Sequence, residues 1–117
     1  MTDTQKSKLE ELGVNIDETL ERFVGNEDLY LRCLNKLIDD KNYDNMKAAI
    51  ANKDVTASFD SAHALKGVTA NLGLDILYKE MRVITEVFRA GSLEYDAGNM
   101  DRINSAYDKV IDTIKDL

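Results

Sequence analysis

The absence of proline is the feature that most constrains the fold of this chain. None of its 117 residues is proline, and only six are glycine. Proline ends or kinks a helix, because it has no N–H to donate and its ring collides with the preceding turn. Here only the glycines are expected to interrupt helices, at the positions where turns fall. The sequence therefore favours an all-α fold.

Apolar residues recur at spacings of three and four along most of the chain, which is typical of helices with one buried face. Side-chain oxygens favour helix starts, because they accept hydrogen bonds from unpaired N–H groups. On this basis we predict that Asp17 caps a short helix, that Asn26 begins a long one, and that Asp54 and Asp75 cap the two helices that follow. The predicted long helices cover residues 26–51, 54–72, 75–89 and 99–117, the last of them after a loop at 92–98.

The polar stretch 39–45 is the weakest part of the first long helix. It contains neither glycine nor proline, so we predict a continuous or slightly bent helix to about Ala51. Residues 8–23 contain a break at 13–15 and are predicted to form short helical pieces.

Short connections between successive helices require that neighbours pack antiparallel. A chain of 117 residues also suits one hydrophobic core, because two cores would each bury too little apolar surface. The predicted architecture is one domain over residues 1–117, an up-down antiparallel four-helix bundle with a short N-terminal helical cover.

Charge and composition exclude several classes of function. The formal net charge of −7 and the isoelectric point near 4.6 would repel nucleic acids and anionic membranes, so protein partners are favoured. No stretch approaches the ~20 apolar residues of a membrane span, and no apolar signal region follows the polar N-terminus, which predicts a cytoplasmic protein. The single cysteine, Cys33, lies among leucines and is predicted to be a core residue, and nothing suggests a metal site.

The single histidine, His63, lies in the middle of the predicted helix 54–72. That helix also carries apolar residues such as Phe59 and Leu65. At about 100° per residue, its inward face carries Ala62, Leu65, Thr69 and Leu72. His63 falls to one side, in line with Asp60, Gly67 and Ala70, which predicts an exposed imidazole. A lone exposed histidine is usually an ordinary surface residue.

Two neighbouring residues favour a functional role for His63. Lys66 is three residues further along and within reach on the same side of the helix, where its ammonium could neutralise phosphate oxygens. A glycine such as Gly67 inside a helix lowers its stability by about 0.5–1 kcal/mol relative to alanine. We therefore expect the glycine to have another role that offsets this loss. Its missing side chain would let a partner protein approach the imidazole; a close helix–helix contact is the structural alternative.

Residues 62–73, AHALKGVTANLG, resemble the signature of histidine-containing phosphotransfer (HPt) domains: a histidine followed by Leu, Lys and Gly, with a Leu-Gly pair ending the helix. Residues 22–30, RFVGNEDLY, are similar to the segment that leads into the first long helix of that family. The resemblance implies that His63 is phosphorylated and that Lys66 stabilises the phosphate. We assign partner docking to Asp60, Gly67, Ala70 and Asn71.

The resemblance further implies a phosphocarrier without independent catalytic activity. The partners would be response-regulator receiver domains and a hybrid sensor histidine kinase, with magnesium bound by the receiver only. The module itself would need no cofactor and would be a monomer.

Two other functions remain open from the residues alone. The same surface could bind or sequester a receiver or helical partner without any phosphoryl transfer. A histidine acid–base enzyme is disfavoured, because no second catalytic group or cofactor motif accompanies His63. The initial methionine and the helical C-terminus suggest a complete protein, although a domain of a longer kinase would look the same.

Overall fold

Seven α-helices and one 3-10 turn make up the regular structure in a computed structural model that describes residues 1–117, and there is no β-strand. In chain order the elements are α1 (Asp3–Glu10), α2 (Ile16–Glu21), α3 (Glu27–Lys36), η1 (Leu37–Asp39), α4 (Asn42–Ala51), α5 (Val55–Asn71), α6 (Asp75–Arg89) and α7 (Ala97–Lys115). The prediction of an all-α fold is confirmed. None of these helices combines the length and the apolar character needed to cross a bilayer.

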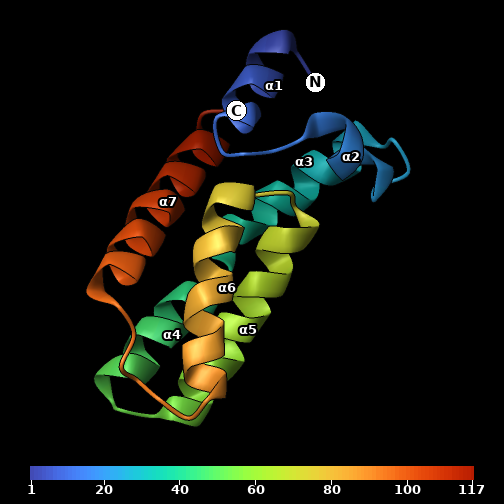
Figure 1. Ribbon diagram of the computed structural model, residues 1–117. Coiled ribbons are helices and arrows are strands. Elements are labelled where there is room, and N and C mark those ends of the chain that lie inside the picture. The colour runs from blue at the N-terminus through green and yellow to red at the C-terminus, as the bar shows by residue number, and fades with distance from the viewer.

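The helices from α3 onward follow the long axis of a molecule that measures 43 × 23 × 22 Å. In Figure 1 the chain descends through α3 and α4, ascends through α5, descends through α6 and ascends through α7. Each of α4, α5 and α6 packs against the next helix in the chain. The short helices α1 and α2 lie at the end of the molecule where α7 finishes (Figure 1), as predicted for an N-terminal cover.

The predicted continuous helix over 26–51 is wrong, because the chain leaves the helical conformation after η1. Asp40 has an extended backbone (φ −71°, ψ 130°), and its side-chain Oδ1 accepts a hydrogen bond from the backbone N–H of Asn42 at 2.8 Å. Short aspartate side chains compete with the helical ladder by making such local bonds. The polar stretch therefore separates α3 from α4 without glycine or proline.

Two of the predicted helix starts are confirmed and two are wrong. Asn26 and Asp54 cap α3 and α5 by accepting hydrogen bonds from backbone N–H groups. Asn15 caps α2 instead of Asp17, which lies in the first turn, where its negative charge still favours the helix. Asp75 is the first residue of α6 and not its cap, a position taken by Leu74 without a side-chain hydrogen bond.

The connection between α5 and α6 depends on Gly73. Its φ of +72° lies in the left-handed region, and a Cβ at this position would collide with the Thr19 hydroxyl on α2. Glycine meets both requirements because it has no side chain. This close approach packs α2 against the turn of the α5–α6 hairpin.

The C-terminal end of α5 is held by side chains from two other segments. The buried Tyr30 hydroxyl on α3 donates to the Leu72 carbonyl at 2.8 Å. Arg22 donates to the carbonyls of Ala70 and Asn71 at 3.1 and 3.2 Å. The carbonyls of Asn71 and Leu72 lie at the end of the helix, where intrahelical donors are lacking, and these bonds supply donors to them. Burial raises the pKa of the Tyr30 hydroxyl, which remains a neutral donor.

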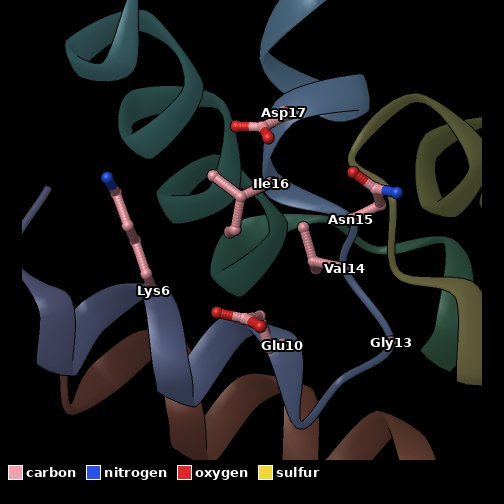
Figure 2. A pocket seen from close by; sticks show the side chains of 7 residues that line it. All are labelled: Lys6, Glu10, Gly13, Val14, Asn15, Ile16 and Asp17. Carbon is pink, nitrogen blue, oxygen red and sulfur yellow. The ribbon is translucent and has the colours of Figure 1, made fainter.

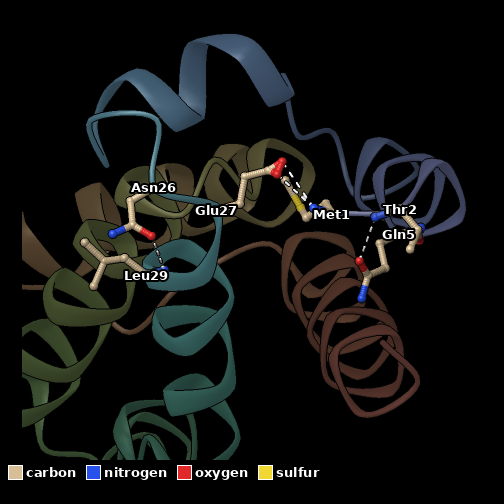
Figure 3. A network of polar contacts seen from close by, with 6 residues as sticks. All are labelled: Met1, Thr2, Gln5, Asn26, Glu27 and Leu29. Carbon is tan, nitrogen blue, oxygen red and sulfur yellow. Dashed lines mark hydrogen bonds and ion pairs between the residues drawn. The ribbon is translucent and has the colours of Figure 1, made fainter.

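The N-terminal segment is fixed by polar contacts at the same end of the molecule (Figure 3). The Met1 ammonium binds both carboxylate oxygens of Glu27, at 2.8 and 3.1 Å, and this hydrogen bonding lowers the pKa of Glu27. Thr2 and Gln5 form a reciprocal capping box at the start of α1. Lys8 of α1 pairs with Asp116 beyond the end of α7 at 2.8 Å. The cover is therefore joined to both α3 and the C-terminal segment.

One apolar cluster fills the interior and includes residues of the N-terminal cover as well as of the longer helices. From α5 it takes Ala62, Leu65 and the capping residue Leu72, while Thr69 is buried beside them. The predicted inward face of this helix is therefore confirmed. Its burial determines which side of α5 remains exposed.

We predict that Tyr30→Phe lowers the free energy of unfolding by about 1–2 kcal/mol, because the buried Leu72 carbonyl would lose its donor. Urea denaturation measures the change. Tyr78→Phe is the matched control, since Tyr78 is half-buried on α6 and takes no part in this bond. Equal stability of Tyr30→Phe and the wild-type protein would show that water replaces the lost hydroxyl.

Candidate functional site

His63 is the central residue of α5 and its side chain is exposed, as predicted. Side-chain hydrogen bonds are made at both ends of this helix. Asp54 caps the start of α5, and Arg22 and Tyr30 hold its end. The imidazole is thus presented at the surface by a helix that is fixed at both ends.

Most of the predicted site residues lie along one side of α5. We call them the exposed stripe of α5, which consists of Asp60, His63, Gly67, Ala70 and Asn71. All of them are exposed except Ala70, which is half-buried. The structure therefore brings these residues together on one side of the helix.

Lys66 lies beside the stripe and is half-buried. None of the four ion pairs in the chain includes it, so its charge is not neutralised by a carboxylate. Side chains three residues apart on a helix lie close together. The Lys66 ammonium is therefore available to an anion attached to His63.

Gly67 is open to solvent. A Cβ built at this position meets no atom within 4 Å apart from its own helical backbone and its chain neighbours. The alternative explanation from the sequence, a close helix–helix contact, is therefore wrong. The glycine leaves a flat surface one turn beyond the imidazole.

An aromatic stack, which the sequence did not predict, covers part of His63. The Phe59 ring lies one turn earlier on α5, with its centroid 5.4 Å from that of the imidazole and an angle of 12° between the ring planes. Parallel offset rings at such distances contribute about 0.5–1.5 kcal/mol beyond the burial of their area. Phe59 was expected only as one of the apolar residues of its helix, but its ring also supports the imidazole.

Arg89 adds a cation to the same cluster. Its Cζ lies 4.9 Å from the centroid of the Phe59 ring, and its Nε contacts Glu86 Oε1 at 3.2 Å. The spacing of four between Phe59 and His63 could have indicated their contact, whereas Arg89 is placed only by the packing of α6 on α5.

The imidazole of His63 is exposed and stands apart from the polar side chains of the molecule. His63 has no hydrogen bond to a carboxylate or hydroxyl group, and no cavity is lined by it. No group of three or more His, Cys, Asp or Glu side chains lies close enough together to hold a metal ion. The imidazole is therefore accessible to a group that another molecule brings.

The largest cavity lies elsewhere, between α1 and α2 (Figure 2). It has a volume of about 580 Å³ and is lined by Lys6, Glu10, Gly13, Val14, Asn15, Ile16 and Asp17. No predicted site residue lines it. A smaller groove of about 190 Å³ does reach the stripe, because Asn71 and Val68 line it together with Cys33 and Lys36 of α3.

Comparison with protein families links the chain to one of them. The model of the Hpt domain family matches residues 40–113, which is more than half of the chain and includes every predicted site residue. Comparisons with curated proteins and with solved structures found no match.

We predict that Gly67→Ala raises the free energy of unfolding by about 0.5–1 kcal/mol, because alanine favours the helix and the added methyl group meets no neighbour. Gly73→Ala is the contrasting control and should destabilise the protein, since it combines a left-handed backbone with a collision. Urea denaturation compares both variants with the wild type. A loss of stability in Gly67→Ala would contradict the open environment of this glycine.

Proposed function

We propose, since this chain belongs to the Hpt domain family, that His63 accepts a phosphoryl group from the phospho-aspartate of one receiver domain and donates it to the aspartate of another. Membership of this family implies that the chain has a histidine phosphotransfer role in two-component signalling. The observation that supports the finer assignment is that the only histidine of the chain is exposed at the centre of α5.

The transfer requires only a nucleophile from this chain. The lone pair of a neutral ring nitrogen of His63 forms a bond to phosphorus as the bond from phosphorus to the aspartate oxygen breaks. The electron pair of that broken bond leaves with the aspartate carboxylate. The receiver would supply the acidic pocket and the magnesium ion that stabilise the moving charge. Transfer to a second receiver reverses these steps.

Lys66 and the exposed stripe of α5 support this proposal. The Lys66 ammonium, free of any ion pair, would neutralise charge on the phosphorylated imidazole. Gly67 would allow the receiver backbone to approach, while Asp60, Ala70 and Asn71 would contact the docked partner. The groove at Asn71 continues this surface towards α3.

Hpt domains carry phosphoryl groups and are not in general catalysts. We propose that this chain acts in the same way, as a cytoplasmic monomer without a cofactor of its own, and that a hybrid sensor histidine kinase is a further partner. Its acidic surface is consistent with protein partners, since the formal net charge is −7.

We predict that His63→Gln abolishes acceptance of phosphate from a phosphorylated receiver. The exposed side chain contributes little to the core, so the helical circular dichroism should stay close to that of the wild type, and the melting temperature should fall only by the small contribution of the Phe59 stack. Transfer of radiolabelled phosphate measures the loss. Retained labelling of the variant would exclude His63 as the acceptor. Equal receiver binding by both proteins, with neither labelled, would support a module that only binds its partner.

We also predict that Gly67→Gln slows transfer from the receiver, because the longer side chain would obstruct the approach to His63 while the reacting nitrogen stays unchanged. Ala48→Gln is a matched control, since it adds a glutamine to an exposed position of α4. Single-turnover rates compare the two variants. A wild-type rate in Gly67→Gln would remove this glycine from the docking surface.

A further inference from the structure

The imidazole of His63 is stacked on the ring of Phe59. An exposed histidine on a helix ordinarily samples several staggered rotamers, and its ring plane turns with them. Here the imidazole lies nearly parallel to the Phe59 ring, at 12°, with 5.4 Å between the centroids. An offset stack of this kind favours one orientation of the ring plane over the others.

Such a contact leaves the reacting atoms free. The lone pair of an imidazole nitrogen lies in the plane of the ring, so a neighbour that covers a ring face does not block it. Phosphoryl transfer needs nitrogen, phosphorus and the leaving oxygen to align within about 3–3.5 Å between the reacting atoms. A fixed ring plane therefore lowers the number of ring orientations that are sampled before the reacting atoms align. It also leaves the ring nitrogen accessible to the phosphoryl group.

Phe59 is itself held in place. Its side chain is half-buried and packs against the apolar core, and the Arg89 guanidinium of α6 lies 4.9 Å from its ring centroid. Glu86, one turn before Arg89 on α6, pairs with that guanidinium at 3.2 Å. The ring that supports His63 is thus contacted from the core and from a second helix.

We propose that Phe59 is a positioning residue for phosphoryl transfer, whose ring fixes the plane of the His63 imidazole. This inference rests on the proposed function, because it concerns the rate at which His63 reacts. Phe59 acts through His63 and makes no contact with the phosphoryl group.

The test compares side chains with and without an aromatic ring at this position. Phe59→Leu and Phe59→Met keep an apolar side chain but remove the stack, whereas Phe59→Tyr keeps the ring. Phe23→Leu is the matched control, because Phe23 is a buried aromatic residue that packs on Tyr30 and not on His63. Two readouts are needed: single-turnover transfer at increasing concentrations of phosphorylated receiver, and NMR shifts of the His63 ring protons.

We expect Phe59→Leu and Phe59→Met to lower the maximal transfer rate on the order of 10-fold with an unchanged half-saturating receiver concentration, since alignment and not docking is lost. The His63 ring protons should lose the upfield shift caused by the Phe59 ring. Phe59→Tyr should keep both the transfer rate and the upfield shift at their wild-type values. Phe23→Leu should lower the melting temperature while the rate and the shift stay at their wild-type values.

Wild-type rates in Phe59→Leu and Phe59→Met would overturn the inference and leave the proposed function intact. An equal loss of rate in Phe23→Leu would also overturn it, because the effect would then follow from general destabilisation. A wild-type chain that accepts no phosphate would contradict the proposed function, and the inference with it. The NMR shift distinguishes these cases, since it reports the stack without any phosphate.

Discussion

Burial of one face of α5 is the constraint on which the rest of the structure depends. Leu65 and Ala62 on that face are fully buried, and the rotation of the helix that buries them leaves His63 exposed. The position of the imidazole is therefore determined by packing on the opposite side of its own helix. A shift of one residue in this packing would turn the side chain by about 100° and remove it from the surface that a partner can reach.

The supports of α5 come from segments that lie far away in the sequence. Tyr30 and Arg22 hold the carbonyls at its C-terminal end, and Gly73 lets α2 pack on the turn that follows. These contacts fix the backbone, while the side chains around His63 remain accessible. Sites built on fixed helices hold their groups more precisely than sites on loops. Arg22 at the end of α2 and Tyr30 on α3 thus help to hold α5, although both lie outside residues 40–113, which match the Hpt family.

The elements that could be predicted from the sequence are those determined by local chemistry. The spacing of apolar residues and the Asp54 cap predicted α5, and the same periodicity predicted an exposed His63. The break at Asp40 was missed, because a side-chain hydrogen bond ends the helix there without glycine or proline. The contact of Arg89 with Phe59 could not be predicted, since it depends on how α6 packs on α5.

Identification of the phosphorylated atom tests the central claim most directly. The wild-type chain would be incubated with a phosphorylated receiver domain, digested at neutral to alkaline pH, and sequenced by tandem mass spectrometry. We expect a single phosphate on His63 that is lost in acid, because the bond from phosphorus to an imidazole nitrogen is acid-labile. An acid-stable phosphate, or one on any other residue, would contradict the assignment of His63 as the phosphoryl carrier.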